Sequence, residues 1–230
     1  MQASDKNFLF HASSLDVMND SAEYAEARKL CPDPIDEIIM SYELGIPFAL
    51  CFSEKDDSIP MWNMYAHEGK GVCLKFDFEC INRYFDSFAE QEKYNNRYVK
   101  FSKCNYRKIR SRTPINNKTG NLQYPNIALL REKMTKAAFV KPNSFCHEGE
   151  WRLIAWRKWD KAVACDMLFK ESKDELCPYI IVPIPISCLK EIVLRPNASY
   201  QLLEATRLLK YLYGENNEIS VNISSLTLKV

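Results

Sequence analysis

The sequence lacks the signatures of several common protein classes. No uninterrupted apolar run approaches the ~18 residues of a membrane-spanning helix, so we expect no membrane partner. The 31 basic and 30 acidic residues give a formal net charge of +1, and no global field favours DNA or a lipid surface. The motifs G-x-x-x-x-G-K, G-x-G-x-x-G and G-x-S-x-G are absent, which excludes a P-loop, a Rossmann phosphate site and a hydrolase nucleophile elbow.

The nine cysteines form no metal-binding pattern. No C-x-x-C pair occurs, and the adjacent Cys146 and His147 would point apart in an extended chain, so we expect no metal. The N-terminal residues 1–6 are polar and no apolar core follows them, which predicts a chain without a secretory leader. An odd cysteine count in such a chain predicts reduced thiols and a cytoplasmic location.

The order of apolar patterns predicts one α+β domain over residues 1–230, with a split or strongly twisted mixed sheet flanked by helices. Several neighbouring strands lack a helical crossover, which argues against a doubly wound parallel sheet. The expected strands are 7–11, 48–53, 72–76, 98–106, 151–156, 179–183, 190–194 and 219–223. The expected helices are 13–30 (with Ser13 and Ser14 as candidate N-caps), 35–44, 60–66, 78–92, 125–139 and 199–213.

Two glutamates stand at the start of one expected strand. Because side chains in a strand alternate, Glu148 and Glu150 would point to the same side, and Arg152 shares their parity as a counter-charge. Two like charges on one face are unfavourable for stability alone, so the pair is either functional or a solvated edge. Lys141 is expected to pair with an acid near the sheet and to have no catalytic role.

An aromatic pair and a basic segment complete the candidate features. Trp62 and Tyr65 are three residues apart, so on a helix they share a face, which is either core or the wall of a ligand pocket. Residues 107–123 combine arginines with proline, asparagine and glycine and predict a mobile basic loop. Such a loop is either a solvated surface or a phosphate contact.

The motifs occur in a recognisable order, namely Asn19-Asp20-x-x-Glu23, Phe52-Ser53, Trp62-x-x-Tyr65, Gly71-x-Cys73 and Glu148-x-Glu150-x-Arg152-Leu153. This order resembles a widespread bacterial family of domains of unknown function, and the likeness spans nearly the whole chain.

A histidine on an early strand, a middle tyrosine and a glutamate opening a late strand are also similar to ADP-ribosyltransferases of the His-Tyr-Glu type. The arginine-modifying branch of these enzymes is not matched, because its first strand carries Arg where this chain has His11. The likeness implies an ADP-ribosyltransferase-like fold and NAD as the substrate. It implies that His11, Tyr65 and Trp62 bind NAD and that Glu150 stabilises the developing ribosyl cation.

The same likeness implies two further roles. Glu148 would orient or deprotonate the acceptor. Arg152 would either anchor the pyrophosphate or neutralise the two glutamates.

Three functions follow as expectations. The first is an NAD-consuming transferase or glycohydrolase with a protein or nucleic-acid acceptor, acting as a bacterial toxin or anti-phage effector. The second is a non-catalytic module that senses a nucleotide or binds a phage component. The third is a nucleic-acid-processing protein that uses the basic residues of loop 107–123.

Overall fold

The computed structural model describes residues 7–17, 44–66, 70–94, 97–107, 127–158, 166–172, 175–196, 198–214 and 218–226. The elements run along the chain as β1 (Asn7–Ser14), η1 (Leu15–Val17), β2 (Ile46–Ser53), α3 (Ile59–Tyr65), β3 (Val72–Phe76), α4 (Phe78–Tyr94), β4 (Tyr98–Lys103), β5 (Asn105–Arg107), α5 (Ile127–Ala138), β6 (Val140–Pro142), η3 (Asn143–Glu148), β7 (Glu150–Arg157), β8 (Met167–Ser172), β9 (Glu175–Pro185), η4 (Ile186–Cys188), β10 (Leu189–Leu194), α6 (Ser199–Tyr213) and β11 (Ser220–Ile223).

The fold is α+β, as the sequence predicts. Contacts divide the chain into two compact units. Unit 1 comprises residues 1–8, 53–84 and 183–230, and unit 2 comprises residues 9–52 and 85–182. The expectation of a single domain over residues 1–230 stays a prediction.

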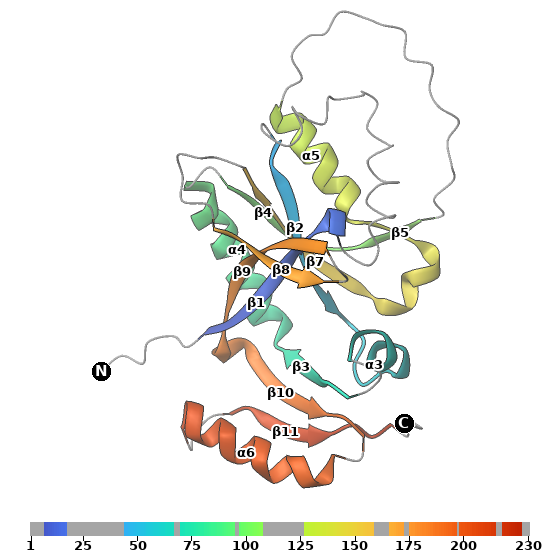
Figure 1. The fold of residues 1–230 in the computed structure, drawn as a ribbon, viewed down its shortest axis with the longest axis vertical. Coiled ribbons are helices and arrows are strands. Elements are labelled where there is room, and N and C mark those ends of the chain that lie inside the picture. The colour runs from blue at the N-terminus through green and yellow to red at the C-terminus, as the bar shows by residue number, and fades with distance from the viewer. Residues whose placement is uncertain are drawn as a thin grey trace, which may run out of the picture. The chain divides into compact units, whose positions relative to one another are not determined.

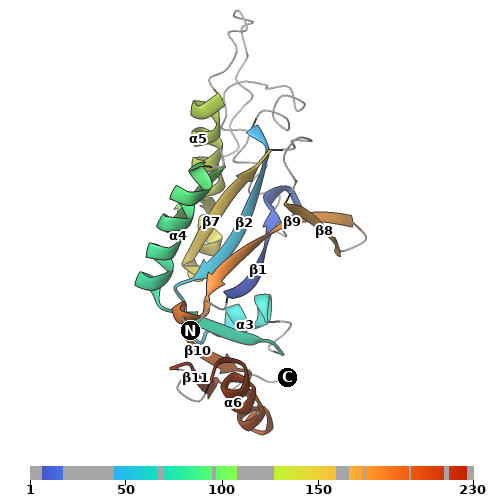
Figure 2. The ribbon, with the colours of Figure 1, turned by 90° about the vertical axis from the view of Figure 1, so that its left-hand side faces the viewer.

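Unit 2 is built on a six-stranded sheet in the order β4-β7-β2-β1-β9-β8 (Figures 1 and 2). The pairs β4/β7, β1/β2 and β8/β9 are antiparallel, so none of them requires the helical crossover of a parallel pair. Strand β7 lies inside this sheet, between β4 and β2, and five consecutive residues from Leu153 to Arg157 are buried.

Helices α4 and α5 cover opposite faces of this sheet, on either side of the strands in Figure 1. On one face Phe85 of α4 packs against Phe52 and Phe101, with ring centroids 5.8 and 4.9 Å apart. On the other face Ile154 and Trp156 of β7 join a core cluster with residues of α5, including Leu130, Met134 and Ala138. The two faces alternate along β7 as the period of a strand requires.

Unit 1 contains the three-stranded sheet β11-β10-β3 and helix α6. β10 and β11 are parallel, and α6 supplies the crossover that a parallel pair needs. Cys80 at the start of α4 forms a disulfide with Cys188 in η4. The prediction of reduced thiols is therefore wrong for this pair, because spacing in the sequence does not reveal which cysteines the fold brings together.

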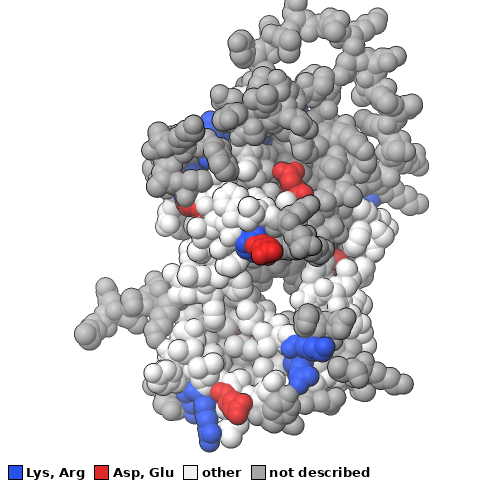
Figure 3. Space-filling view, viewed as in Figure 1, with Lys and Arg blue, Asp and Glu red and all other residues white. Residues whose placement is uncertain are grey.

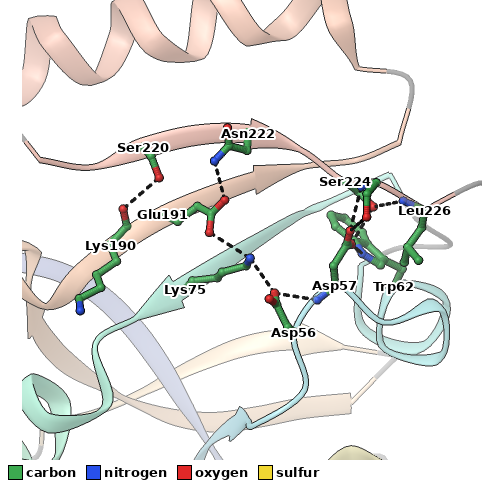
Figure 4. A network of polar contacts seen from close by, with 11 residues as sticks. Asp56, Asp57, Trp62, Lys75, Lys190, Glu191, Ser220, Asn222, Ser224 and Leu226 are labelled. Carbon is green, nitrogen blue, oxygen red and sulfur yellow. Dashed lines mark hydrogen bonds and ion pairs between the residues drawn. The ribbon is translucent and has the colours of Figure 1, made fainter.

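A polar network fixes the C-terminal segment of unit 1 (Figure 4). The Asp57 carboxylate accepts hydrogen bonds from Trp62 Nε1 and Ser224 Oγ, both at 2.7 Å, and from the backbone N–H of Ser225 at 2.9 Å. Burial opposes ionisation of Asp57, but these donors outweigh it and lower its pKa. The carboxylate thus connects the indole of α3 to the residues that follow β11.

One predicted helix start is wrong. Ser13 and Ser14 belong to β1, where they pair with Ala49 and Phe48 of β2, and the short η1 helix follows. Pairing with a distant strand has overridden the local capping preference of serine. The rest of predicted helix 13–30 after residue 17, the N-D-x-x-E motif and almost all of predicted helix 35–44 lie outside the described residues.

Two strand predictions also differ from the structure. Predicted strand 98–106 breaks at Cys104 into β4 and β5, because β5 leaves the large sheet and pairs in parallel with β6. Strand β8 was not predicted at all. In the basic loop 107–123, only Arg107 lies within the described residues.

Candidate charge cluster on strand β7

Four buried charged residues meet where β7 begins. Lys141 of β6 binds Glu148, the last residue of η3, and its Nζ lies 2.9 Å from Glu150 Oε2. Arg152 forms a bidentate ion pair with Glu150, with Nε 2.7 Å from Oε1 and Nη2 3.1 Å from Oε2. All four side chains are at most 7% exposed, so both glutamates are desolvated and paired.

Gly149 brings the two glutamates together. Its φ of 55° lies in the left-handed region that favours glycine. Gly149 follows the last residue of η3 and precedes the first residue of β7. Glu148 therefore belongs to η3, so the strand parity expected of it does not apply. Its carboxylate reaches the same partner as Glu150 because Lys141 lies between the two.

The surrounding backbone holds the cluster in place. Arg152 Nη1 donates to the carbonyl of Ala138 at 2.8 Å, at the C-terminus of α5, where unpaired carbonyls favour a cation. The N–H of Glu150 donates to the Tyr106 hydroxyl at 2.7 Å, and the carbonyl of Glu150 accepts from the N–H of Cys104 at 2.8 Å. The first residue of β7 is thus fixed on both sides of its backbone.

Electrostatics keep Glu150 ionised. Burial raises the pKa of its carboxyl, but hydrogen bonds and charge from Arg152, together with hydrogen bonds from Cys51 and Lys141, lower the pKa below its ordinary value. The pKa of Arg152 is correspondingly raised, because Glu150 outweighs the effect of its burial. Glu150 is therefore a carboxylate at neutral pH and not a general acid.

Cys51 of β2 gives this cluster a solvent-accessible neighbour. Its side chain is exposed and hydrogen-bonds to Glu150. Desolvation nevertheless raises the pKa of the thiol, with the Glu150 charge as the next cause. Cys51 is thus exposed as a residue while protein atoms surround its thiol, and the raised pKa keeps the thiol a protonated donor at neutral pH.

His11 lies in the same sheet as Glu150, two strands away. Ser13 of β1 pairs with Ala49 of β2, and continuing this antiparallel register places His11 opposite Cys51. His11 is exposed, and its ring packs on Tyr179 of β9 with centroids 4.2 Å apart.

Tyr65 and Trp62 belong to unit 1, whereas His11 and Glu150 belong to unit 2. Trp62 is 2% exposed and bonded to Asp57, so its ring lies in the core of its unit. Tyr65 is 55% exposed. Convergence of His11, Tyr65 and Glu150 around one ligand stays a prediction.

Sequence reasoning missed Cys51 and Tyr106 as neighbours of Glu150. For Cys51, part of the signal is present in the sequence. Ala49 and Cys51 are two residues apart in β2, so their side chains point to the same face, and the register with β1 then places His11 on that face as well. No local pattern identifies Tyr106, because its hydroxyl reaches Glu150 from a separate small sheet.

Other classes of site find little support in the described part of the chain. No three His, Cys, Asp or Glu residues gather there in a way that suits a metal ion. None of the described helices is long and apolar enough to cross a membrane. On the face in Figure 3, the charged side chains of the described residues form small separate groups and no extended basic surface.

Comparison with known proteins gives one match. No curated protein and no solved structure is significantly similar to the chain. One protein family, described as "Protein of unknown function (DUF2971)", matches residues 61–153. The matched segment begins just before Trp62 and ends just after Arg152, so it contains both the W-x-x-Y and the E-x-E-x-R-L motifs. Residues 61–153 of this chain are therefore similar to the DUF2971 family of domains of unknown function.

Proposed function

We propose that this chain is an NAD-consuming enzyme with an ADP-ribosyltransferase-like fold and mechanism, and that Glu150 stabilises the reacting ribose. The observation that supports the proposal is the state of Glu150. Its carboxylate is buried, ionised and held by two cations, and the exposed residue Cys51 donates a hydrogen bond to it. In a bacterium such an enzyme would act in the cytoplasm as a toxin or an anti-phage effector.

The chemistry requires a fixed negative charge beside the ribose. Cleavage of the bond between ribose C1′ and the nicotinamide nitrogen sends the bonding electron pair to nicotinamide, which leaves as a neutral molecule. Positive charge develops on the ribose and is stabilised by a preorganised carboxylate. Water or a protein or nucleic-acid nucleophile then bonds to C1′ and releases a proton.

The hydrogen bonds of Glu150 indicate where a substrate would enter. A carboxylate has about four acceptor positions, and Arg152 occupies two, Lys141 one and Cys51 one. A thiol is the weakest donor of the three, and Cys51 is the one of these three residues that is exposed. A ribose hydroxyl would therefore displace Cys51 and leave both cations in place.

The remaining residues take roles that follow from their contacts. All three guanidinium nitrogens of Arg152 are used on Glu150 and Ala138, which favours the counter-charge role over a pyrophosphate anchor. Glu148 binds Lys141 and is proposed to orient the acceptor. Of the two aromatic residues in α3, Tyr65 is exposed and Trp62 is buried, so Tyr65 is the one that can contact a ligand.

The test is a pair of Glu→Gln variants in unit 2. Glu150→Gln removes the proposed catalytic charge, and Glu92→Gln is the matched control because Glu92 is also buried and paired with an arginine, Arg157 at 2.7 Å. Both variants should lose stability, since each breaks a buried ion pair. Only Glu150→Gln should lose release of nicotinamide from NAD, measured at equal folded concentration with and without cell extract.

Two outcomes contradict the proposal. One is a wild-type chain that neither binds nor cleaves NAD under these conditions. The other is equal loss of NAD cleavage in both variants, which would assign Glu150 a structural role.

A second candidate is a non-catalytic module that senses a nucleotide. The observation that favours it is the neutrality of the cluster, in which two cations balance two carboxylates. For such a module, Glu150→Gln would change the affinity for NAD or ADP-ribose while no nicotinamide appears with either protein.

A further inference from the structure

A row of side chains extends across the unit 2 sheet, away from the charge cluster. The His11 and Tyr179 rings pack at 4.2 Å with an angle of 30° between their planes. Lys170 of β8 places its Nζ 5.7 Å from the Tyr179 ring centroid and 3.3 Å from Ser13 Oγ. We call His11, Tyr179 and Lys170 the strip.

The strip and Cys51 lie on one face of the sheet. Ser13 and His11 are two residues apart in β1, so their side chains point to the same side. Lys170 touches Ser13, and Tyr179 touches His11. Continuing the β1/β2 register by two residues from the Ser13–Ala49 pair places Cys51 opposite His11, and directly opposite residues share a face. Cys51 in turn contacts Glu150.

The row is long enough for an extended ligand. It crosses the five neighbouring strands β7, β2, β1, β9 and β8. Lys170 Nζ reaches Ser13 of β1, two strands from β7, so at a spacing of about 4.8 Å per strand its charge lies roughly 10 Å across the sheet from Glu150. This distance suits a nucleotide lying across the strands better than a single small ion.

We propose that the strip binds the phosphate-bearing part of a dinucleotide or of ADP-ribose whose reacting ribose lies at Glu150. The identity of the nucleotide rests on the proposed function, whereas the strip itself is defined by its contacts. Lys170 supplies a point charge of the kind that binds phosphate. Within the described part of the chain its neighbours are a hydroxyl and an aromatic ring, and no carboxylate neutralises it.

His11 and Tyr179 supply an apolar contact beside the Lys170 cation. Tyr179 covers part of the His11 ring, yet His11 remains exposed and can contact a ribose or a base. A ligand in this position therefore meets a carboxylate at Glu150, and both the aromatic rings and the Lys170 cation at the strip.

The test uses ADP-ribose, which has two phosphates, and adenosine, which has none, as calorimetric probes of the full chain. Lys170→Met removes the charge but keeps the side-chain stem. Lys170→Arg keeps the charge, and Lys100→Met is the matched control because Lys100 is an exposed lysine on edge strand β4 of the same sheet. Lys170→Met should weaken ADP-ribose binding by about 10- to 100-fold, with Lys170→Arg closer to wild type and Lys100→Met unchanged. Adenosine binding should not change in any of the three.

The outcomes separate this inference from the proposed function. Lys170-dependent binding of ADP-ribose without any cleavage of NAD supports the strip and contradicts the enzyme. Cleavage of NAD with the same KM in wild type and Lys170→Met supports the enzyme and overturns the strip. Absence of ADP-ribose binding, or a Lys170 effect seen only with a short single-stranded oligonucleotide, also overturns it. Melting curves of each variant show whether the fold is intact.

Discussion

Glu150 stays ionised although it is almost completely buried, because Arg152 and Lys141 offset the cost of its desolvation. Breaking such a pair costs more than the pair contributes, since the partner is left buried and charged. The stability of unit 2 therefore depends on whether the Glu150 side chain is ionised. This coupling makes the stability of the chain depend on pH.

We predict that the free energy of unfolding decreases in acid. The folded-state pKa of Glu150 is lowered, so its contribution is present above the unfolded pKa of about 4.3 and is lost as the pH falls through the folded value. Urea unfolding between pH 7 and pH 3 measures this decrease. Glu150→Gln should reduce the slope, and an identical slope in wild type and variant would show that Glu150 does not contribute.

A second prediction at the residue scale concerns Cys51. If a ribose hydroxyl displaces the Cys51 thiol from Glu150, the KM for NAD should depend on the strength of the hydrogen bond that residue 51 donates to Glu150. Cys51→Ala should lower KM, and Cys51→Ser should raise it, because a hydroxyl is the stronger donor. Each change corresponds to about 1 kcal/mol, roughly fivefold in KM. Equal KM values across the series would place the substrate elsewhere.

At the scale of elements, β7 organises unit 2 through a charge cluster at each end. Glu150 and Arg152 stand at its start, and Arg157 at its end pairs with Glu92 and with Asp166 at 3.0 Å. The residues between them are apolar and buried. A strand with polar ends and an apolar middle has only one register that satisfies all of its groups, since a slip by one residue would bury the charges unpaired.

Gly45, just before β2, lies close to the backbone at the end of this strand. A Cβ at Gly45 would lie 2.3 Å from the carbonyl oxygen of Arg157, and its φ of 87° is strained for other residues. We predict that Gly45→Ala destabilises the chain by more than ~3 kcal/mol in denaturant titrations. Gly214→Ala is the control, because Gly214 has a φ of 93° but open space around it, and should cost only ~1–3 kcal/mol. An equal loss of unfolding free energy in the two variants would show that the close contact with Arg157 does not add to the destabilisation.

The sequence predicts most elements of this fold because their signals are local. Residues 72–76 and 199–213 have the predicted boundaries, since alternation, helical spacing and Gly214 mark them directly. Ser13 and Ser14 were misassigned because β2, more than thirty residues away, pairs with them. The same limit applies to the site. The Glu148–Glu150 pair is visible in the sequence, whereas its contacts with Lys141 and Cys51 depend on strand order.

At the scale of the whole molecule, the Cys80–Cys188 disulfide links residues 108 positions apart within unit 1. A bridge across so long a loop restricts the unfolded chain strongly, by about 4–5 kcal/mol on chain-entropy grounds. We predict that a reductant lowers the free energy of unfolding by up to this amount in the wild type and not in Cys80→Ser. Thiol titration of the denatured, unreduced chain should find at least two fewer free thiols than its nine cysteines. A count of nine would contradict the bridge.

The most direct test of the central claim is the rate of nicotinamide release from NAD by the purified chain, compared with Glu150→Gln and Glu92→Gln at equal folded concentration. We predict release by the wild type and by Glu92→Gln, and loss of release on the order of 100-fold or more in Glu150→Gln. No release from any of the three proteins, or the same rate in wild type and Glu150→Gln, would contradict it.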